Sequence, residues 1–251
     1  MWHLYRLPEH ARRLYPQLST TFSGGRVADK QPVTPSESVE NFLKAVYTLQ
    51  KGTDRVSTNA LANALNILPP SVTDMARRMA GANLVDYRKY YGIRLTEEGE
   101  AMALKVIRRH RLIELYLVQE LGYDLPSVHE DAERLEHVVS DRFIRAIDVK
   151  LAYPTIDPHG DPIPSADGTI AQRDLIALAQ LEKGVPGRVR RFVSDDNSML
   201  EHILDRGFQL DAEVEVTASD PFDGPITVLV DGQERVIGCS VAASILVDIM
   251  D

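Results

Sequence analysis

Two short helical patterns on either side of a tight turn restrict the fold of this chain more than any other feature. The first follows Ser57, a good N-cap residue, and the second begins at Pro69-Pro70, because proline is favoured in the first turn of a helix. Residues 84–95 then alternate apolar and polar side chains around a basic, aromatic centre, which is typical of a β-hairpin. Together these signals predict a winged helix-turn-helix.

Helical periodicity continues on both sides of this segment. Apolar residues recur at helical spacing over residues 39–49, so a helix is expected before it. After it, Thr96 can cap a helix over residues 97–121, and Ser127 can cap a second one over residues 128–148. Two long amphipathic helices after a winged helix favour a dimerisation element.

The last third of the chain has a different character. Residues 153–168 are rich in proline and glycine, so they cannot continue a helix and mark a domain boundary. Strand-like runs follow at 187–193, 213–218 and 226–230, with one helix near 198–206, which fits a small β-barrel. The expected fold is therefore mainly α with a small β domain.

The composition excludes several classes of protein. The chain has 251 residues, with 28 Lys+Arg, 37 Asp+Glu and a net charge of −9, which is an ordinary globular balance. A single cysteine, Cys239, rules out an intramolecular disulfide and a metal site built from cysteines. We find no membrane span and no secretion signal, so a cytoplasmic protein is expected. The acidic balance argues mildly against nucleic acid, although a local basic patch would suffice for DNA binding.

Histidines and glutamates gather in the two helices expected after the hairpin. They recur at intervals of three or four residues within each helix: His110, Glu114, His129, Glu133, Glu136 and His137. If the helices pack antiparallel, these side chains converge, as the ligands of a divalent transition metal must. One competing interpretation is a solvated helix face. Another is a metallohydrolase, which leaves the hairpin and its basic residues unexplained.

Five segments match, in order, the motifs of one known family: Val39 to Tyr47, Pro70 to Thr73, Arg109 to Leu112, Val128 to Asp141, and Asp157 to Pro164. On these segments, residues 38–164 resemble the diphtheria toxin repressor family of metal-dependent transcriptional repressors, including its manganese transport regulator branch. The region after Gly187 resembles, more weakly, the SH3-like, FeoA-type domain of longer members.

With this resemblance the chain divides into five parts. These are a flexible leader (1–35), a winged helix-turn-helix DNA-binding domain (36–101), a metal-binding and dimerisation domain (102–152), a Pro-rich linker (153–169) and an SH3-like, FeoA-type domain (170–251).

The resemblance also implies two metal sites. The primary, activating site would use Asn41, Glu133, Glu136 and His137, and the ancillary site would use His110, Glu114 and His129. The iron-responsive branch has a cysteine where this chain has Glu133, so an oxygen ligand here favours Mn(II), with Fe(II) as the alternative. Lys44 stands where manganese-type members with a two-metal cluster have a glutamate, which argues against a closely spaced pair of ions. Arg191 and Ser194 align with further ligands of longer members, and neither is a good ligand.

The expected DNA contacts lie in the second helix of the helix-turn-helix and in the hairpin: Pro70, Ser71, Thr73, Asp74, Arg77, Arg78, Arg88 and Lys89. The family resemblance implies a homodimer that presents two such helices about 34 Å apart to a palindromic DNA operator. It further implies repression of metal uptake genes when metal is plentiful, with no catalytic residue and no small-molecule substrate. A repressor that answers to an organic effector is the remaining alternative, in which the glutamates and histidines are structural.

Overall fold

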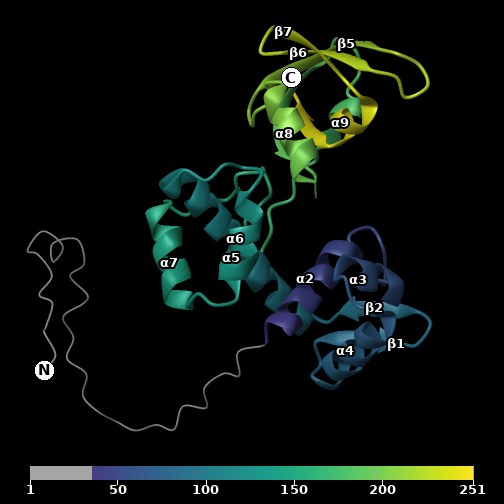
Figure 1. Ribbon diagram of the computed structural model, residues 1–251, viewed down its shortest axis with the longest axis vertical. Coiled ribbons are helices and arrows are strands. Elements are labelled where there is room, and N and C mark those ends of the chain that lie inside the picture. Colours follow the sequence, from purple (N-terminus) through teal and green to yellow (C-terminus); the bar gives the residue numbers. More distant parts are fainter. Residues whose placement is uncertain (1–35, 195, 251) are drawn as a thin grey trace, which may run out of the picture. The chain divides into compact units, whose positions relative to one another are not determined.

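The computed structural model describes residues 36–194 and 196–250, so the expected leader (1–35) lies outside the described part. Its first elements are α2 (Glu37–Gln50), α3 (Thr58–Ala64), α4 (Pro69–Gly81), β1 (Val85–Arg88) and β2 (Gly92–Leu95) (Figure 1). Strands β1 and β2 pair antiparallel as a hairpin. The winged helix-turn-helix that the sequence predicts is therefore confirmed.

Local sequence signals explain these elements. The Ser57 hydroxyl accepts a hydrogen bond from the Ala60 amide at 3.1 Å and so caps α3. Asn66 has a φ of 51° in the turn between α3 and α4, a conformation that asparagine adopts more readily than most residues. Val72 and Ala76 are fully buried and pack with the apolar face of α2. The buried side of α4 packs on this core, so the opposite side of α4 is exposed.

Three helices follow, namely α5 (Glu97–Leu121), α6 (Val128–Glu136) and α7 (Asp141–Lys150) (Figure 1). The Thr96 side chain caps α5, and Gly122 ends it with a left-handed φ of 73°. The expected single helix over 128–148 is wrong, because the chain breaks it after α6. Ser140 caps α7 by accepting a hydrogen bond from the Phe143 amide at 3.2 Å, so a local capping signal interrupts the apolar periodicity.

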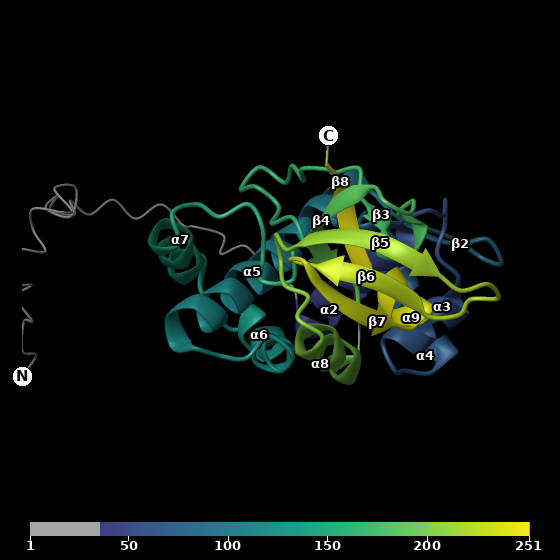
Figure 2. The same cartoon turned by 90° about the horizontal axis from the view of Figure 1, so that it is seen from above.

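The C-terminal part is an antiparallel sheet with short helices. Its elements are β3 (Ile176–Ala177), η2 (Leu178–Gln180), β4 (Pro186–Phe192), α8 (Asn197–Asp205), β5 (Glu213–Ser219), β6 (Ile226–Val230), β7 (Gln233–Ile237), α9 (Cys239–Ala243) and β8 (Ile245–Ile249). The strand order is β3-β8-β4-β5-β6-β7, and Figure 2 shows β5, β6 and β7 side by side. The three expected strands and the helix are present, and β3, β7 and β8 are further strands that were not predicted. The fold class, mainly helical with a C-terminal sheet domain, is confirmed.

Buried apolar side chains form three separate cores, one in each group of elements. Within residues 36–194 and 196–250, every helix is too short or too polar to span a lipid bilayer.

Candidate metal centre and nucleic-acid interface

Several candidate metal ligands from two helices lie close together. Helix α6 packs on α5, so the side chains that face each other share one space. Five of the expected donors on α5 and α6 fall in groups whose ligand atoms lie within 4.8 Å of one another: His110, Glu114, His129, Glu133 and Glu136. His137, which ends α6, falls in none of these groups. The solvated-face interpretation fails for Glu114 and Glu136, because both are buried, whereas the His129 side chain is 57% exposed.

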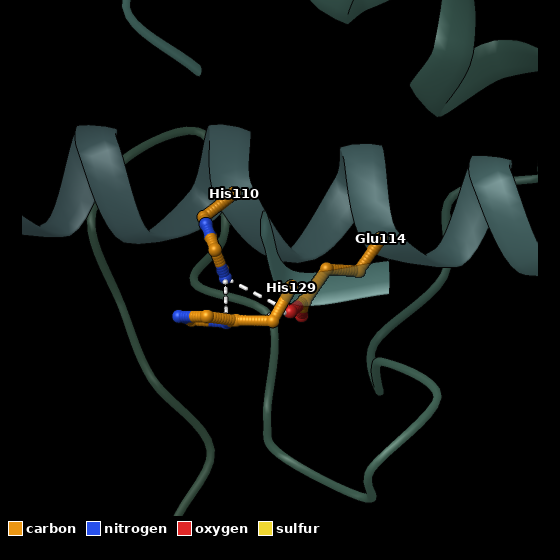
Figure 3. Close-up of side chains that lie close together, drawn as sticks. All are labelled: His110, Glu114 and His129. Atoms are coloured by element: carbon orange, nitrogen blue, oxygen red, sulfur yellow. Dashed lines mark hydrogen bonds and ion pairs between the residues drawn. The ribbon is translucent and has the colours of Figure 1, made fainter. Parts of the chain in front are cut away.

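The first group of donors consists of His110, Glu114 and His129 (Figure 3). His110 Nε2 lies 2.9 Å from Glu114 Oε1 and 3.1 Å from His129 Nδ1, and His129 Nδ1 lies 3.2 Å from Glu114 Oε1. One ligand atom from each residue falls within 4.8 Å of the others. These are the three residues expected for the ancillary site, and a cation could be held between them.

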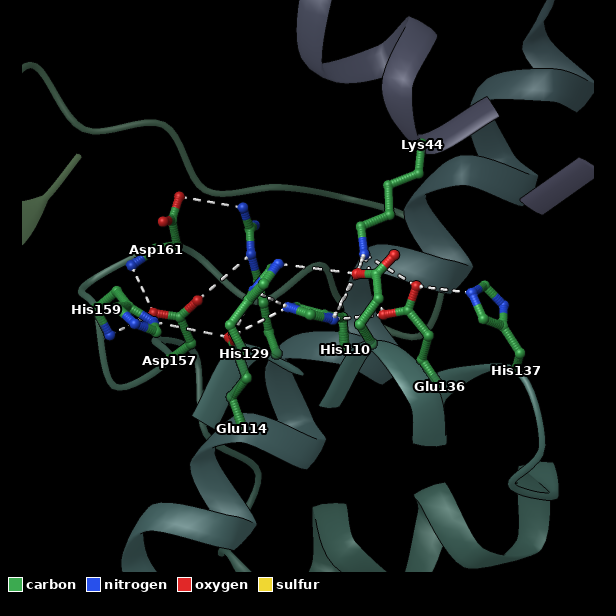
Figure 4. Close-up of polar contacts among 11 residues, drawn as sticks. Lys44, His110, Glu114, His129, Glu136, His137, Asp157, His159 and Asp161 are labelled. Carbon is green, nitrogen blue, oxygen red and sulfur yellow. Dashed lines mark hydrogen bonds and ion pairs between the residues drawn. The ribbon is translucent and has the colours of Figure 1, made fainter. Parts of the chain in front are cut away.

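The second group consists of His110, Glu133 and Glu136, and Lys44 of α2 lies among them (Figure 4). Lys44 Nζ donates to Glu133 Oε2 at 2.7 Å and to Glu136 Oε1 at 2.9 Å. His110 Nδ1 lies 2.5 Å from Glu136 Oε2 on the same side. The two carboxylates expected at the primary site therefore already share a positive partner.

His137 faces a different acidic residue. Its Nδ1 lies 2.6 Å from Glu40 Oε2, and Glu40 also contacts Arg109 Nη1 at 3.4 Å. A carboxylate at Nδ1 fixes the proton on that nitrogen, so Nε2 keeps the lone pair that can bind a metal. His137 Nε2 and Asn41 Oδ1 are both buried without a hydrogen-bond partner among the described residues.

A third group of donors was not predicted from the sequence, although its segment carries part of the family resemblance. Asp157 and His159 meet Glu114 in a set of donors within 4.8 Å of one another, and His159 Nδ1 lies 3.7 Å from Glu114 Oε2. The Asp-Pro-His spacing was the available signal, but the contact with α5 is long-range. Arg191, expected as a poor ligand, instead pairs with Asp161 in this loop at 2.5 Å.

Backbone packing holds this loop in place. Gly160 has a φ of 90°, and a Cβ there would lie 2.0 Å from the Arg190 carbonyl oxygen of β4. The Phe192 amide also donates to the His159 carbonyl oxygen at 2.9 Å. Glycine is therefore required at position 160, and β4 fixes the backbone that carries Asp157 and His159.

The charges in these groups depend on one another. Burial disfavours the charged form of His110, but hydrogen bonds with Glu114 and Glu136 raise its pKa to about 9. Burial also opposes ionisation of Glu114, yet its hydrogen bonds with His110 and His129 hold its pKa far below the ordinary value. Burial, together with the charges of Asp161 and Glu114, raises the pKa of Asp157 to about 7. Such mutual perturbation is typical of a functional cluster.

The donor set fits a divalent first-row metal ion. Carboxylate and amide oxygens with imidazole nitrogens suit Mn(II) and Fe(II), and the described residues contribute no thiolate to these groups. The buried, unpartnered Asn41 Oδ1 and His137 Nε2 would each gain a partner from such an ion.

The expected DNA contacts of α4 lie on its exposed side. Pro70, Ser71 and Arg78 are exposed, whereas Thr73 is half-buried and its hydroxyl donates to the Pro69 carbonyl oxygen at 3.2 Å. The Thr73 hydroxyl can donate to a DNA phosphate only after this hydrogen bond to Pro69 is broken. Farther along α4, an exposed ion pair joins two more of the expected contacts at 3.4 Å: Asp74 and Arg77.

The hairpin adds basic and aromatic side chains. Arg88 and Lys89 are exposed, Lys89 Nζ lies 4.9 Å from the centre of the Tyr90 ring, and Tyr90 and Tyr91 are 91% and 78% exposed. Arginine and lysine at such a tip can meet DNA phosphates. The exposed tyrosines beside them were not among the predicted DNA contacts.

A winged helix-turn-helix together with a buried cluster of histidines and carboxylates defines a metal-dependent DNA-binding transcriptional regulator. Three family models match the chain. They are the N-terminal DNA binding domain of iron dependent repressors (35–93), their metal binding and dimerisation domain (96–165) and the FeoA domain (176–249). The chain belongs to the iron-dependent repressor family, whose members are transcriptional repressors and not enzymes. The resemblance seen in the sequence is confirmed, and the metallohydrolase alternative loses its support.

Both iron and manganese repressors are among its relatives. The iron-dependent repressor IdeR of Mycobacterium leprae is 30% identical over 212 residues, 80% of this chain and 91% of that protein. The regulator MntR of Lysinibacillus sphaericus is 34% identical over 128 residues, 49% of this chain and 90% of that protein. A solved manganese-dependent transcriptional repressor in complex with manganese has a TM-score of 0.79 and 38% identity, covering 84% of this chain and 100% of that one.

Proposed function

We propose that this chain is a Mn(II)-activated repressor of metal uptake genes that binds a palindromic operator as a homodimer in the cytoplasm. The observation that carries the metal part is the pair of buried polar atoms without partners, Asn41 Oδ1 and His137 Nε2. They lie on α2 and at the end of α6, and His137 Nε2 is 3.4 Å from Glu136 Oε1. Unpartnered buried polar atoms are costly, so a cation that joins them is favoured.

Asn41, Glu133, Glu136 and His137 would hold the activating ion, and Glu40 would orient His137 through its Nδ1 proton. A bound ion would supply a positive centre shared by ligands of α2 and α6.

A second ion would lie between His110, Glu114 and His129. Asp157 and His159 give Glu114 an alternative set of partners for this ancillary ion.

The preference for Mn(II) over Fe(II) rests on the hardness of the ligands. Glu133 and Asn41 offer oxygen atoms, and Mn(II) is selected by such hard ligands and by geometry because it lies low in the affinity series. Fe(II) is the alternative, since it accepts the same oxygen and imidazole donors.

The link from metal to DNA would pass through α2. Its buried face packs in one core with α4, so a change in the position of α2 relative to α6 also moves the DNA-reading helix. Arg77 and Arg78 of α4 and Arg88 of the hairpin would then neutralise phosphates. Metal and DNA would strengthen each other's binding to the same degree, because the coupling free energy is reciprocal.

Dimerisation would use apolar side chains that the helical part leaves exposed. They lie on α7 and on the segments that flank it: Val138, Phe143, Val149 and Tyr153. Several exposed apolar side chains along one segment favour a protein partner, and a second copy of the chain fits the matched dimerisation domain.

We also propose the domain division given above, with boundaries at 36–101, 102–152, 153–169 and 170–251. The three separate cores support it. Ile163 of the linker packs in the middle core, so this part of the linker is an ordered extension of the middle domain.

The test is fluorescence anisotropy of a labelled duplex from upstream of this gene or of a metal transporter gene. Protein is titrated at fixed salt with chelator, with Mn(II) and with anaerobic Fe(II). We expect tight binding to the duplex only when a metal ion is present. The free concentration of Mn(II) needed should be lower than that of Fe(II). Equal affinity under all three conditions would refute the proposal and favour an organic effector.

A further inference from the structure

In the second donor group, the ammonium of Lys44 lies where a metal ion could otherwise lie. Its Nζ lies 2.7 Å from Glu133 Oε2, 2.9 Å and 3.2 Å from the two oxygens of Glu136, and 3.5 Å from His110 Nδ1. Without that ammonium, the three residues form a group whose donors lie within 4.8 Å of one another, as in a metal site. We propose that Lys44 is a built-in cation that fills this group and excludes a second metal ion next to the primary one.

The inference rests on the proposed function, since it concerns how many ions the metal centre accepts. Glu136 is fully buried, and a buried carboxylate needs a positive partner. Lys44 supplies one from α2 through a flexible stem, with a side chain that is only 20% exposed. A group tethered in this way acts at an effective concentration of about millimolar or more, so a free ion competes poorly for the same place.

His110 can serve only one of the two groups that contain it. Its Nδ1 faces Glu136 at 2.5 Å, and its Nε2 faces Glu114 at 2.9 Å. A neutral imidazole has one proton and one lone pair, so one nitrogen donates and the other binds. Glu136 Oε2 accepts the proton of Nδ1, which leaves the Nε2 lone pair for the group with Glu114 and His129. Lys44 pairs with Glu136 beside Nδ1, so it acts both on the number of ions and, through Glu136, on the site at which His110 is a ligand.

The test replaces the ammonium and counts metal ions. Lys44→Glu gives the group a further carboxylate, Lys44→Met keeps the length without charge, and Lys44→Arg keeps the charge. Lys183→Met, in an exposed turn of the C-terminal domain, is the matched control for loss of a lysine. Mn(II) bound per chain is measured by calorimetry and by dialysis with metal analysis. Electron paramagnetic resonance then reports whether two Mn(II) ions are close enough to couple, about 3.5–4 Å in two-metal sites.

We expect Lys44→Glu and Lys44→Met to bind one more Mn(II) per chain than the wild type. The resolved hyperfine signal of isolated Mn(II) should give way to that of a coupled pair. Lys44→Arg and Lys183→Met should keep the wild-type number. If Lys44→Glu does not fold, as judged by circular dichroism, Lys44→Met carries the test.

Two results would overturn the role of Lys44. One is a wild-type number of ions in folded Lys44→Glu and Lys44→Met, and the other is a coupled Mn(II) pair in the wild type. If the proposed function is wrong, a different result is expected: metal does not change the affinity of the wild type for DNA. In that case an ion gained by Lys44→Glu still supports the exclusion of metal by the lysine.

Discussion

Glu40→Ala should weaken Mn(II) binding although Glu40 is not among the proposed ligands. Glu40 Oε2 lies 2.6 Å from His137 Nδ1, so its loss frees the imidazole to rotate and to change tautomer. Loss of a partner of this kind lowers metal affinity by about 10–100-fold. We expect an effect in that range, because Glu40 is buried and water replaces it poorly.

The same change should also lower the free energy of unfolding. A hydrogen bond to a charged group contributes about 1.5–3 kcal/mol. Arg109 keeps Asp141 as a partner at 2.7 Å, so the loss should stay below the roughly 3–5 kcal/mol of a buried ion pair broken outright. Urea unfolding with chelator present measures this term apart from metal binding.

Competition with a fluorescent chelator gives the Mn(II) affinity. Glu40→Gln keeps an acceptor oxygen for His137 and should lose less affinity than Glu40→Ala. Glu37→Ala is the control, because Glu37 is exposed in the first turn of the same helix. A folded Glu40→Ala protein with the Mn(II) affinity of the wild type would refute the reasoning, since His137 would then need no orienting partner or would not be a ligand.

Further substitutions test the other parts of the centre. Glu133→Cys should shift the metal preference toward Fe(II) or later metals, and an unchanged ranking would contradict the softness argument. His137→Ala should abolish metal-activated operator binding in anisotropy titrations, while gel filtration still shows the dimer. Arg78→Ala should weaken DNA binding for all sequences alike and reduce the salt slope by about 1, whereas a sequence-selective loss would indicate a base contact. With chelator present, the raised pKa of His110 stabilises the fold fully below about 6.5, and this contribution is lost as pH rises through about 9. Proton loss also frees His110 for metal, so Mn(II) affinity should rise over the same range, and a pH-independent affinity would exclude His110 as a ligand.

Local signals made most of the helical part predictable. Thr96 and Gly122 mark the ends of α5 by capping and by a left-handed φ, and both act within one turn of the helix. Ser140 carries the same kind of signal for α7, but the apolar periodicity continues across it and predicts one helix where there are two. Strands β7 and β8 were missed because a strand depends on partners elsewhere in the sheet.

Within the candidate centre, spacing along a helix was a sufficient guide only for pairs on one helix. His110 and Glu114 are four residues apart on α5, so their contact follows from helical geometry. Asp157 and His159 reach Glu114 from a loop, and Lys44 reaches Glu136 across 92 residues of sequence. Such contacts depend on tertiary packing, which periodicity does not encode.

The ion pairs between α2 and α6 have a consequence for gene control. Lys44 joins α2 to Glu133 and Glu136 of α6, and Glu40 joins α2 to His137. These links between the helices need no metal ion. A DNA-binding domain held by these contacts samples fewer orientations than one that is connected only by the backbone. Part of the operator affinity should therefore persist when metal is scarce. Some repression of the target genes would then remain when metal is scarce. Transcription of its targets would rise in a graded way as metal falls, with a ceiling below that of a strain that lacks the repressor.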